Sequence, residues 1–406
     1  MKTIFAIVAL AVAGAAQGQY ARPKSDAPQG ERGPDVPAFW IRPGFKVTLA
    51  AKGIADARFM EFDNKGTLYL SRPGKGDVLT LTDNGSGMYD KKATFVDGLK
   101  TVHGLCFNDG WLWFTQSTAV YKGKDADGDG KIDEKITVIP PEELPPGGGH
   151  WWRSILVTDK FLYTSIGDPG NITDLEASKN AEEPRFTERE KIFRFNLDGT
   201  GKQLFASGIR NTEKLRLRPG TDEVWGSDHG SDWYGKEFGD KEGAQPITDY
   251  NPPDELNYYR EGSFYGHPFV VGFRTPRLEF KSRPDIVDLA SRTVVPEWGF
   301  GAHYAINGFT FIHGNKQFAP DVTGDLFAAS HGSWNRKEKA GYRIEQVLFD
   351  DVTGKPYGSL IVVSTLGPKG EVLARPVDCV EAPDGSILWS DDNEGAIYRI
   401  SRAEKE

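Results

Sequence analysis

Apolar residues recur along the chain in short strand-like runs, each followed by a turn with Asp, Asn or Gly and then by an aromatic-rich second run. A polar loop and a further strand complete this unit, which occurs six times. The copies span residues 58–81, 103–123, 153–168 with 191–199, 213–230 with 254–259, 307–336 with 342–350, and 375–400. Six units of two to four short strands match the blades of a six-bladed β-propeller, so the sequence predicts an all-β fold.

The segment FKVTLAAKG, residues 45–53, precedes the first copy. We expect it to add a strand to the last blade, which closes the ring and leaves no open sheet edge. A β-sandwich or two separate β domains are the alternatives, but neither predicts the repeated order of strand, turn, strand and acidic loop. The predicted propeller is a single catalytic domain over residues 19–402, with 403–406 as a C-terminal tail.

The first 18 residues are typical of a secretory signal peptide. Met1-Lys2 gives a basic start, TIFAIVALAVAGAA an apolar run, and Ala16-Gln17-Gly18 the small residues of a cleavage site. A buried N-terminal helix is the alternative, and no later run has the length of a membrane span. We therefore expect a secreted, extracellular protein, with possible N-glycosylation at the sequons of Asn84 and Asn171.

Composition narrows the class of partner. The 406 residues carry a net charge of −9, which disfavours nucleic acid and anionic membranes as partners. The two cysteines, Cys106 and Cys379, suggest a disulfide in a secreted chain. However, they fall in the first strands of the second and sixth units, and non-adjacent blades seldom bring Cα atoms within about 7 Å. We therefore expect two buried free thiols. We also expect the protein to be a monomer.

The stretch DADGDGKIDE, residues 125–134, looks like half of a Ca²⁺ loop. Acidic residues alternate and Gly130 follows them, as in the first half of an EF-hand, but Ile136 replaces the usual Glu and the flanks are strand-like. The alternative is an acidic Asx-type turn. We predict a structural Ca²⁺ site whose residues are Asp125, Asp127, Asp129, Lys131 and Asp133.

Polar residues at equivalent points of the units should meet at one mouth of the central channel. They are Arg72, His150, Arg153, Asp168, Arg210, Asn211, Asp228, His229, His331, Trp334, Asn335, Arg336, Arg375, Asp391 and Asp392. Arg binds carboxylates bidentately and, like Trp, stacks on flat rings. This set predicts a pocket for a flat, polyanionic ligand.

The motifs HWWRSILV, ASGIRNTEKLRLRPGTDEVWGSDHG, PPDELNYYREGSFYGHP, GDLFAASHGSWNR and RPVDCVEAPDGSILWSDDNEGAIYRI resemble the soluble PQQ-dependent glucose/sorbosone dehydrogenase superfamily. More closely, the chain is similar to the secreted fungal PQQ-dependent pyranose dehydrogenases, auxiliary activity family 12, over about residues 35–402. The resemblance implies a six-bladed propeller with pyrroloquinoline quinone (PQQ) and Ca²⁺ at the channel mouth. PQQ, a tricarboxylate, suits the predicted pocket.

The same resemblance implies roles for individual residues. His150 takes the place of the base that removes the sugar hydroxyl proton, and Arg210 that of the group that stabilises the developing oxyanion. The backbone carbonyls of Gly230 and Ser231 match the ligands of the catalytic Ca²⁺. The implied cofactor-binding residues are Arg72, Arg210, Asn211, His331, Trp334, Asn335, Arg336 and Arg375.

The implied substrate is a pyranose or aldose-type sugar, with L-fucose or a glucosone-like compound as candidates. The long segment 233–251 could shape the sugar site. Because the chain ends at SRAEKE, we expect an external electron acceptor: a quinone, a cytochrome domain or a copper polysaccharide monooxygenase. Two other functions stay open, a Ca²⁺-dependent propeller hydrolase such as a lactonase, and a carbohydrate- or protein-binding propeller. The hydrolase needs several carboxylates and Asn around one ion.

Overall fold

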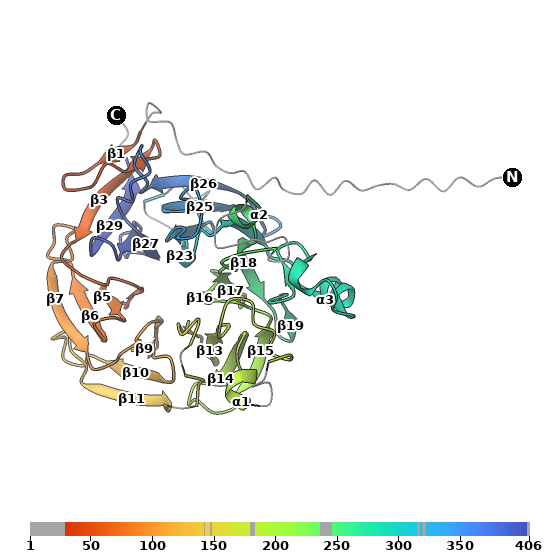
Figure 1. The fold of residues 1–406 in the computed structure, drawn as a ribbon. Helices are drawn as coiled ribbons and strands as arrows, with labels where there is room; N and C mark the ends of the chain where they lie inside the picture. The colour runs from red at the N-terminus through yellow and green to blue at the C-terminus, as the bar shows by residue number, and fades with distance from the viewer. Residues whose placement is uncertain are drawn as a thin grey trace.

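Six antiparallel sheets follow one another around a ring in the computed structural model, as Figure 1 shows. The structure describes residues 29–141, 143–146, 148–178, 183–235, 246–314, 317–318 and 322–403. Five sheets contain four strands that are hydrogen-bonded in chain order, and two of these gain one further strand. The sixth sheet contains three such strands and gains two from the segment before the first blade. This arrangement is the predicted six-bladed β-propeller, and the fold prediction is confirmed.

The first three blades hold the following strands. Blade 1 contains β4 (Met60–Phe62), β5 (Leu68–Arg72), β6 (Asp77–Thr82) and β7 (Lys91–Val96); blade 2 contains β8 (Leu105–Asn108), β9 (Trp111–Thr115), β10 (Val120–Lys124) and β11 (Glu134–Ile139); blade 3 contains β12 (Leu156–Val157), β13 (Phe161–Ile166), β14 (Lys191–Asn196), β15 (Gln203–Ser207) and the added β19 (Ser263–Phe264).

The last three blades complete the ring. Blade 4 contains β16 (Thr212–Leu217), β17 (Val224–Asp228), β18 (Pro253–Tyr259) and β22 (Trp298–Ala302); blade 5 contains β23 (Ile306–Phe311), β24 (Leu326–Ser330), β25 (Arg343–Phe349), β26 (Pro356–Ser364) and the added β2 (Trp40–Ile41); blade 6 contains β27 (Pro376–Glu381), β28 (Ile387–Asp391), β29 (Ala396–Arg402) and the added β3 (Phe45–Ala51) and β1 (Glu31–Arg32).

The hydrophobic core lies between the blades. Six clusters of buried side chains each combine residues from two neighbouring blades, and together they run around the whole ring. This division follows from strand geometry, because successive side chains point to opposite faces and each blade is covered on both. The innermost strands β4, β8, β12, β16, β23 and β27 contact one another in turn, and β27 contacts β4.

The segment before the first blade pairs with the last two blades. β3 is antiparallel to β29, with Val47 opposite Ile400, and β2 is antiparallel to β26. Val47 is fully buried and belongs to the cluster between blades 5 and 6. The outer edges of β29 and β26 are therefore paired with backbone rather than open.

An insertion between β18 and β22 leaves the ring and packs beside blades 3 and 4. It contains β19, the hairpin of β20 (Val270–Val271) and β21 (Thr275–Pro276), the short 3₁₀ helix η2 (Leu278–Phe280) and α3 (Ile286–Arg292), with its own small apolar cluster. β19 runs parallel to β15, so the insertion reaches from blade 4 to blade 3, and Figure 1 shows α3 at the outer rim. The other helices are α1 (Pro184–Thr187) and α2 (Pro246–Tyr250).

Some sequence-based expectations concern residues at the ends and surface of the chain. The predicted signal peptide, residues 1–18, lies outside the described residues. Within the described ranges, no helix has the length and apolar character needed to cross a membrane. Cys106 and Cys379 are buried free thiols. Asn84 is exposed, but the amide nitrogen of Asn171 is buried, which leaves no room for a glycan in this fold.

Candidate functional site

A cavity of about 370 Å³ opens at one mouth of the ring, and it lies in the size range of small-molecule sites. Most of its lining residues are at the entry of innermost strands or after second strands, and Asp254 is at the start of a third strand. Because strands one and two of each blade are antiparallel, these positions share one face of the ring. They are Arg58, His150, Trp152, Arg210, Asn211, Glu213, His229, Gly230, Asp232, Asp254, His303, Ala305, Asn307, His331, Gly332, Trp334 and Asn335.

His150 enters the cavity from the loop before β12. Its ring Nδ1 lies 3.0 Å from the backbone carbonyl oxygen of Asp168, and its backbone N–H donates to the same oxygen at 3.1 Å. A carbonyl only accepts, so Nδ1 carries the proton and Nε2 keeps its lone pair. Burial, and then the charge of Arg210, lower the pKa of His150 well below its usual value. The ring is therefore a neutral base at physiological pH.

The loop that carries His150 is held by two buried guanidinium groups. Arg153, fully buried, donates to the carbonyls of Pro145 at 2.7 Å, Trp151 at 3.1 Å and Trp152 at 2.9 Å. Arg189 donates to the carbonyls of Pro146, at 2.9 Å, and Gly148 in this loop, and to the carbonyl of Asp168 in blade 3. These arginines satisfy carbonyls that a buried loop would otherwise leave unpaired.

A glycine before His150 lets this loop approach blade 3. Gly149 has φ of 55°, and a Cβ there would meet the carbonyl oxygen of Pro169 at 2.3 Å. Only glycine combines this backbone conformation with so close an approach. Gly149 is therefore a geometric requirement for placing the His150 side chain.

Arg210 connects the walls contributed by blades 3 and 4. Its Nε donates to the carbonyl of Asn171 at 2.9 Å, one Nη to the Asn171 side-chain oxygen at 2.7 Å, and the other Nη to the carbonyl of Gly230 at 2.8 Å. A carboxylate oxygen of Asp232 lies 3.4 Å from an Nη of Arg210 and forms an ion pair with it. Asn171, which the sequence marked as a glycan acceptor, instead orients this guanidinium.

Gly230 and Ser231 follow β17 where the backbone is crowded. A Cβ on Gly230 would lie 2.7 Å from the carbonyl oxygen of Pro253, so only glycine fits. The Gly230 N–H donates to the buried carboxyl of Asp254 at 2.8 Å. Ser231 is buried below the cavity, where its hydroxyl donates to the carbonyl of Trp233 at 2.8 Å.

The wall opposite His150 is a network of charged groups that begins at Arg58. This guanidinium lies 4.5 Å from the Trp152 ring centroid and pairs with Glu213 at 3.3 Å and Asp392 at 3.0 Å. His331 extends the network, because its Nε2 lies 3.1 Å from Asp392 and its Nδ1 receives a hydrogen bond from Arg375 at 3.1 Å. This pattern fixes the proton of neutral His331 on Nε2.

The remaining predicted site residues differ in their relation to the cavity. Arg72 does not line it, because its Nε donates to Asp77 within the β5–β6 hairpin at 2.7 Å. Trp334 lies at the rim with 70% of its surface exposed, and Asn335 lines the wall and donates to the Asp232 carbonyl. Arg336 faces the Tyr250 ring at 5.1 Å and also lies outside the lining.

Sequence reasoning missed several residues of the site. Arg58, Trp152, Glu213, Asp254, His303 and Asn307 line the cavity but were not predicted. The place of Arg58 in the repeat could have identified it as a site residue. It precedes the innermost strand of blade 1, as Arg210 precedes the innermost strand of blade 4. Burial raises the pKa of both Glu213 and Asp254 to about 7. Four His and two Arg line the cavity, whereas the predicted set contained three His and five Arg.

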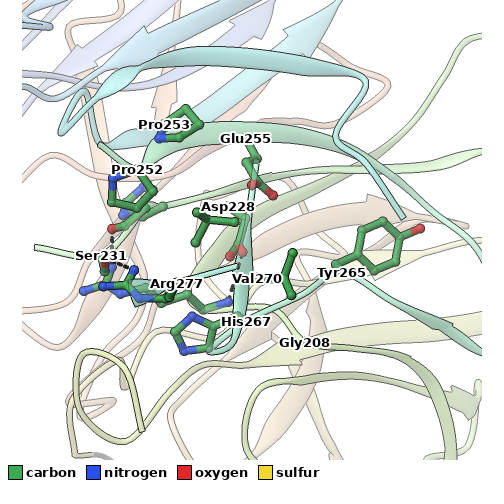
Figure 2. A pocket seen from close by; sticks show the side chains of 14 residues that line it. Gly208, Asp228, Ser231, Pro252, Pro253, Glu255, Tyr265, His267, Val270 and Arg277 are labelled. Atoms are coloured by element: carbon green, nitrogen blue, oxygen red, sulfur yellow. Dashed lines mark hydrogen bonds between the residues drawn. The ribbon is translucent and has the colours of Figure 1, made fainter. Parts of the chain in front are cut away.

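A second, much smaller cavity lies beside the first. It measures about 20 Å³, enough for one water molecule, and Figure 2 shows the side chains of Asp228, Glu255, His267 and Arg277 around it. Asp228 accepts hydrogen bonds from the N–H groups of Arg210 and Asn211, which orients the entry of β16. This cavity is a support behind the mouth rather than a binding site for a large ligand.

The predicted Ca²⁺ loop lies between β10 and β11. Carboxylate oxygens of Asp125, Asp127 and Asp133 lie within 4.8 Å of one another. The Asp129 carboxylate instead pairs with Lys131 at 3.0 Å. Several loop N–H groups donate to these carboxylates, as in Asx turns. The structural Ca²⁺ site stays a prediction.

Comparison with known proteins gives one family and several structures of the same fold. A family model described as TrAA12-like matches residues 39–275. A calcium structure of Trichoderma reesei Carbohydrate-Active Enzymes Family AA12 is 19% identical with a TM-score of 0.75, covering 91% of this chain and 98% of that chain. The holo form of the pyranose dehydrogenase PQQ domain from Coprinopsis cinerea is 16% identical with a TM-score of 0.74, covering 92% and 100%.

Other matches are more distant or shorter. The apo soluble aldose sugar dehydrogenase from Escherichia coli is 17% identical with a TM-score of 0.60, covering 88% of this chain and 100% of that chain. An uncharacterized protein of Borreliella burgdorferi is 30% identical over 212 residues, 52% of this chain and 51% of its own length. An uncharacterized protein of Synechocystis is 28% identical over 294 residues, 66% and 60% respectively. The chain thus spans between half and two thirds of these two relatives.

Proposed function

The chain belongs to the TrAA12-like family, and on this premise we propose that it is a secreted quinoprotein dehydrogenase that oxidises a pyranose or aldose-type sugar. The proposed cofactors are PQQ and Ca²⁺ in the 370 Å³ cavity. The observation that carries the proposal is His150, a neutral imidazole whose Nδ1–H is fixed on a backbone carbonyl while Nε2 is left as a base in the cavity wall.

The cavity wall has the donors that a flat tricarboxylate needs. Arg58 presents a guanidinium face against Trp152, and Arg210 lines the adjoining wall, where its three side-chain hydrogen bonds leave two of its five guanidinium N–H groups. Among buried polar atoms, Nε of Arg58 and Oδ1 of Asn335 have no hydrogen-bond partner within the described part of the chain. Buried donors and acceptors of this kind are expected where a polar ligand completes the network. The half-exposed Arg375, which contacts His331, adds a positive donor.

A cation can also be accommodated beside Arg210. The Gly230 carbonyl accepts from Arg210, but a carbonyl has two lone pairs, so one is left for Ca²⁺. Asp232 is nearby, and its carboxylate is 3.4 Å from the Arg210 guanidinium. We propose Gly230, and Ser231 through its backbone, as the protein ligands of this ion.

PQQ supplies a two-electron acceptor that takes up a hydride from the substrate carbon. The protein residues then handle the proton and the charge. Nε2 of His150 accepts the proton of the sugar hydroxyl, and its bond to Asp168 keeps the ring in the correct tautomer. Arg210 stabilises negative charge that develops near it. Trp334 at the rim offers an aromatic face to the sugar ring.

The rival function of a Ca²⁺-dependent hydrolase has one observation in its favour. Three carboxyl side chains, Glu213, Asp232 and Asp254, and three Asn side chains line the cavity. However, among the residues that the structure describes, groups of three or more His, Cys, Asp or Glu side chains with ligand atoms within 4.8 Å of one another occur only at Asp168, Glu190 and His267, and in the loop of Asp125. Neither place is in the cavity, so the dehydrogenase explains the site better.

Turnover with added cofactor tests the proposal. We expect the chain, loaded with Ca²⁺ and PQQ, to reduce an artificial electron-acceptor dye with an aldose panel that includes L-fucose and glucosone. Replacing His150 by Gln should lower kcat about 10²- to 10⁴-fold with little change in PQQ binding, because only the base is lost. His313→Gln is a matched control, since His313 is an exposed surface residue paired with Glu381.

Two results would count against the proposal. One is dye reduction by His150→Gln at the wild-type rate. The other is hydrolysis of a lactone by the PQQ-free, Ca²⁺-loaded chain with no dehydrogenase activity after PQQ is added, which would favour the hydrolase. The natural acceptor, whether a quinone, a cytochrome domain or a copper polysaccharide monooxygenase, can be tested in the same assay by replacing the dye.

A further inference from the structure

Three buried side chains that could bind a metal ion converge behind the cavity, at the junction of blade 3 and the insertion. Nε2 of His267 lies 2.7 Å from Oδ2 of Asp168 and 3.8 Å from Oε1 of Glu190, and the three ligand atoms lie within 4.8 Å of one another. The side chains are 7%, 0% and 7% exposed for His267, Asp168 and Glu190. None of the three lines the 370 Å³ cavity.

Glu190 is the residue that the fold leaves unexplained. Its Oε1 is fully buried and has no hydrogen-bond partner, although it points at His267 and Asp168. The guanidinium of the adjacent Arg189 donates to the carbonyls of Pro146 and Gly148, and within the described residues it makes no hydrogen bond to Oε1 of Glu190. A buried carboxylate oxygen without a hydrogen-bond partner has lost its hydration with no hydrogen bond in return. Burial and the Asp168 carboxylate correspondingly raise the pKa of Glu190.

The other two ligands are held in place by the fold. Asp168 follows β13, and its carboxylate accepts hydrogen bonds from the N–H and hydroxyl of Thr173 at 2.9 and 2.6 Å. His267 comes from the insertion after β19, and Figure 2 shows its ring beside Asp228 at the small cavity. Glu190 precedes β14, and its carbonyl accepts from the N–H of Gly208 at 3.0 Å. Three segments from different parts of the chain thus bring one side chain each to a common point.

We propose that Asp168, Glu190 and His267 form a binding site for a divalent transition-metal cation of the Zn²⁺ class. One imidazole nitrogen and two carboxylates are a ligand set that Zn²⁺ uses. Ca²⁺ is the poorer fit, because it takes six to eight oxygen ligands and this site offers a nitrogen. The bound ion gives the Glu190 carboxylate oxygen its missing partner and takes the Nε2 lone pair of the neutral His267 ring, whose single proton then lies on Nδ1.

The ion would tie the insertion to blade 3. Asp168 also supplies the carbonyl that fixes His150, and its own N–H donates to the carbonyl of Arg210 at 2.8 Å. The site therefore stabilises the segment on which the cavity wall is built. This inference does not depend on the proposed dehydrogenase, because the three proposed ligand side chains do not line the cavity.

Calorimetric titration with Zn²⁺ tests the site. The full chain is treated with a chelator, returned to excess Ca²⁺ to fill oxygen-rich sites, and titrated with Zn²⁺ alone. We expect saturable binding of one Zn²⁺ per chain in the wild type. Glu190→Gln and His267→Gln should each bind at least about tenfold more weakly. Co²⁺ in place of Zn²⁺ should give a visible absorption band that both variants lose.

Controls separate this site from other histidines. His313→Gln, which removes an exposed His–Glu pair, should leave the titration unchanged, and so should His303→Gln, which removes a histidine of the cavity. The proposal is overturned if the wild type takes up no Zn²⁺ in excess Ca²⁺. It is equally overturned if Glu190→Gln binds as the wild type does, or if binding is lost with His303 instead. Glu190→Gln is nearly isosteric, so it keeps the test valid should His267→Gln not fold.

Discussion

At the residue scale, the candidate base is positioned by backbone groups. The Asp168 carbonyl receives both the Nδ1–H and the backbone N–H of His150. Behind it, Arg153 and Arg189 donate to carbonyls on either side of the same loop. Arg153 is completely buried without a carboxylate among its hydrogen-bond partners, and burial lowers its pKa to about 9. The loop carbonyls are thus what solvates this charge.

We expect Arg153→Met to lower kcat about tenfold to a hundredfold, because the freed loop carbonyls let His150 move from its position. Arg153→Lys should recover part of the loss, since an ammonium has three donors but lacks the guanidinium fork. Steady-state kinetics at a temperature where both variants are folded, with PQQ binding as reference, checks this. Equal kcat in wild type and Arg153→Met would show that the arginine only stabilises the fold.

His103 supplies a pH-dependent prediction. Burial, and then Arg58, lower its pKa well below 6.5, so folding requires the neutral ring while the unfolded chain binds a proton below that pH. Its contribution to stability is therefore complete above about pH 6.5 and is lost as the pH falls, by up to about 1.4 kcal/mol per pH unit. His103→Asn, which keeps a donor toward the Arg153 carbonyl, should flatten the acid side of the stability curve.

The measurement is the free energy of unfolding in denaturant between pH 7.5 and pH 5. Buried carboxyls act in the opposite direction, because the raised pKa of Glu213, about 7, favours the folded state at lower pH. The difference between wild type and His103→Asn cancels most of that effect. An identical acid slope in the two proteins would contradict a neutral, buried His103.

At the scale of elements, the sequence pattern was informative for the inner part of each blade. Every predicted unit contains three inner strands, such as β4, β5 and β6 in residues 58–81. The outermost strands were largely missed, because one side of each faces solvent and their apolar and polar residues do not alternate clearly. For example, β7 has the sequence KKATFV with its first residues exposed, and β15 has the sequence QLFAS. Strand pattern depends on burial, and burial falls toward the rim.

The β10–β11 loop carries a prediction about stability alone. Asp127→Ala should lower the thermal midpoint by a few degrees in excess Ca²⁺, because it removes one of three converging carboxylates. Turnover should stay close to that of the wild type, since the loop does not line the cavity. Thermal unfolding with and without chelator checks this. If the variant and the wild type melt together in Ca²⁺, the loop is an Asx turn and not an ion site.

At the scale of the whole molecule, the ring brings together residues that no local pattern connects. Arg58 and Glu213 are 155 positions apart, and Lys214 and Asp378 are 164 apart, yet both pairs meet inside the ring. The number of blades and the mouth positions such as His150 and Arg210 follow from repeats and motifs. Contacts between blades 1 and 4 do not, because the sequence shows no register between distant units. Position in the repeat also misled for Arg72. It was expected at the mouth with the other residues, but its side chain forms a local ion pair with Asp77.

The most direct test of the proposed function is an equilibrium titration of the Ca²⁺-loaded, cofactor-free chain with PQQ. The account predicts saturable binding of one PQQ per chain that weakens when Ca²⁺ is chelated. It also predicts weaker binding for Arg58→Ala, whose side chain lines the cavity, and unchanged binding for Arg72→Ala, whose side chain does not. No binding of PQQ in excess Ca²⁺ would contradict the account, leaving a TrAA12-like propeller with a different ligand.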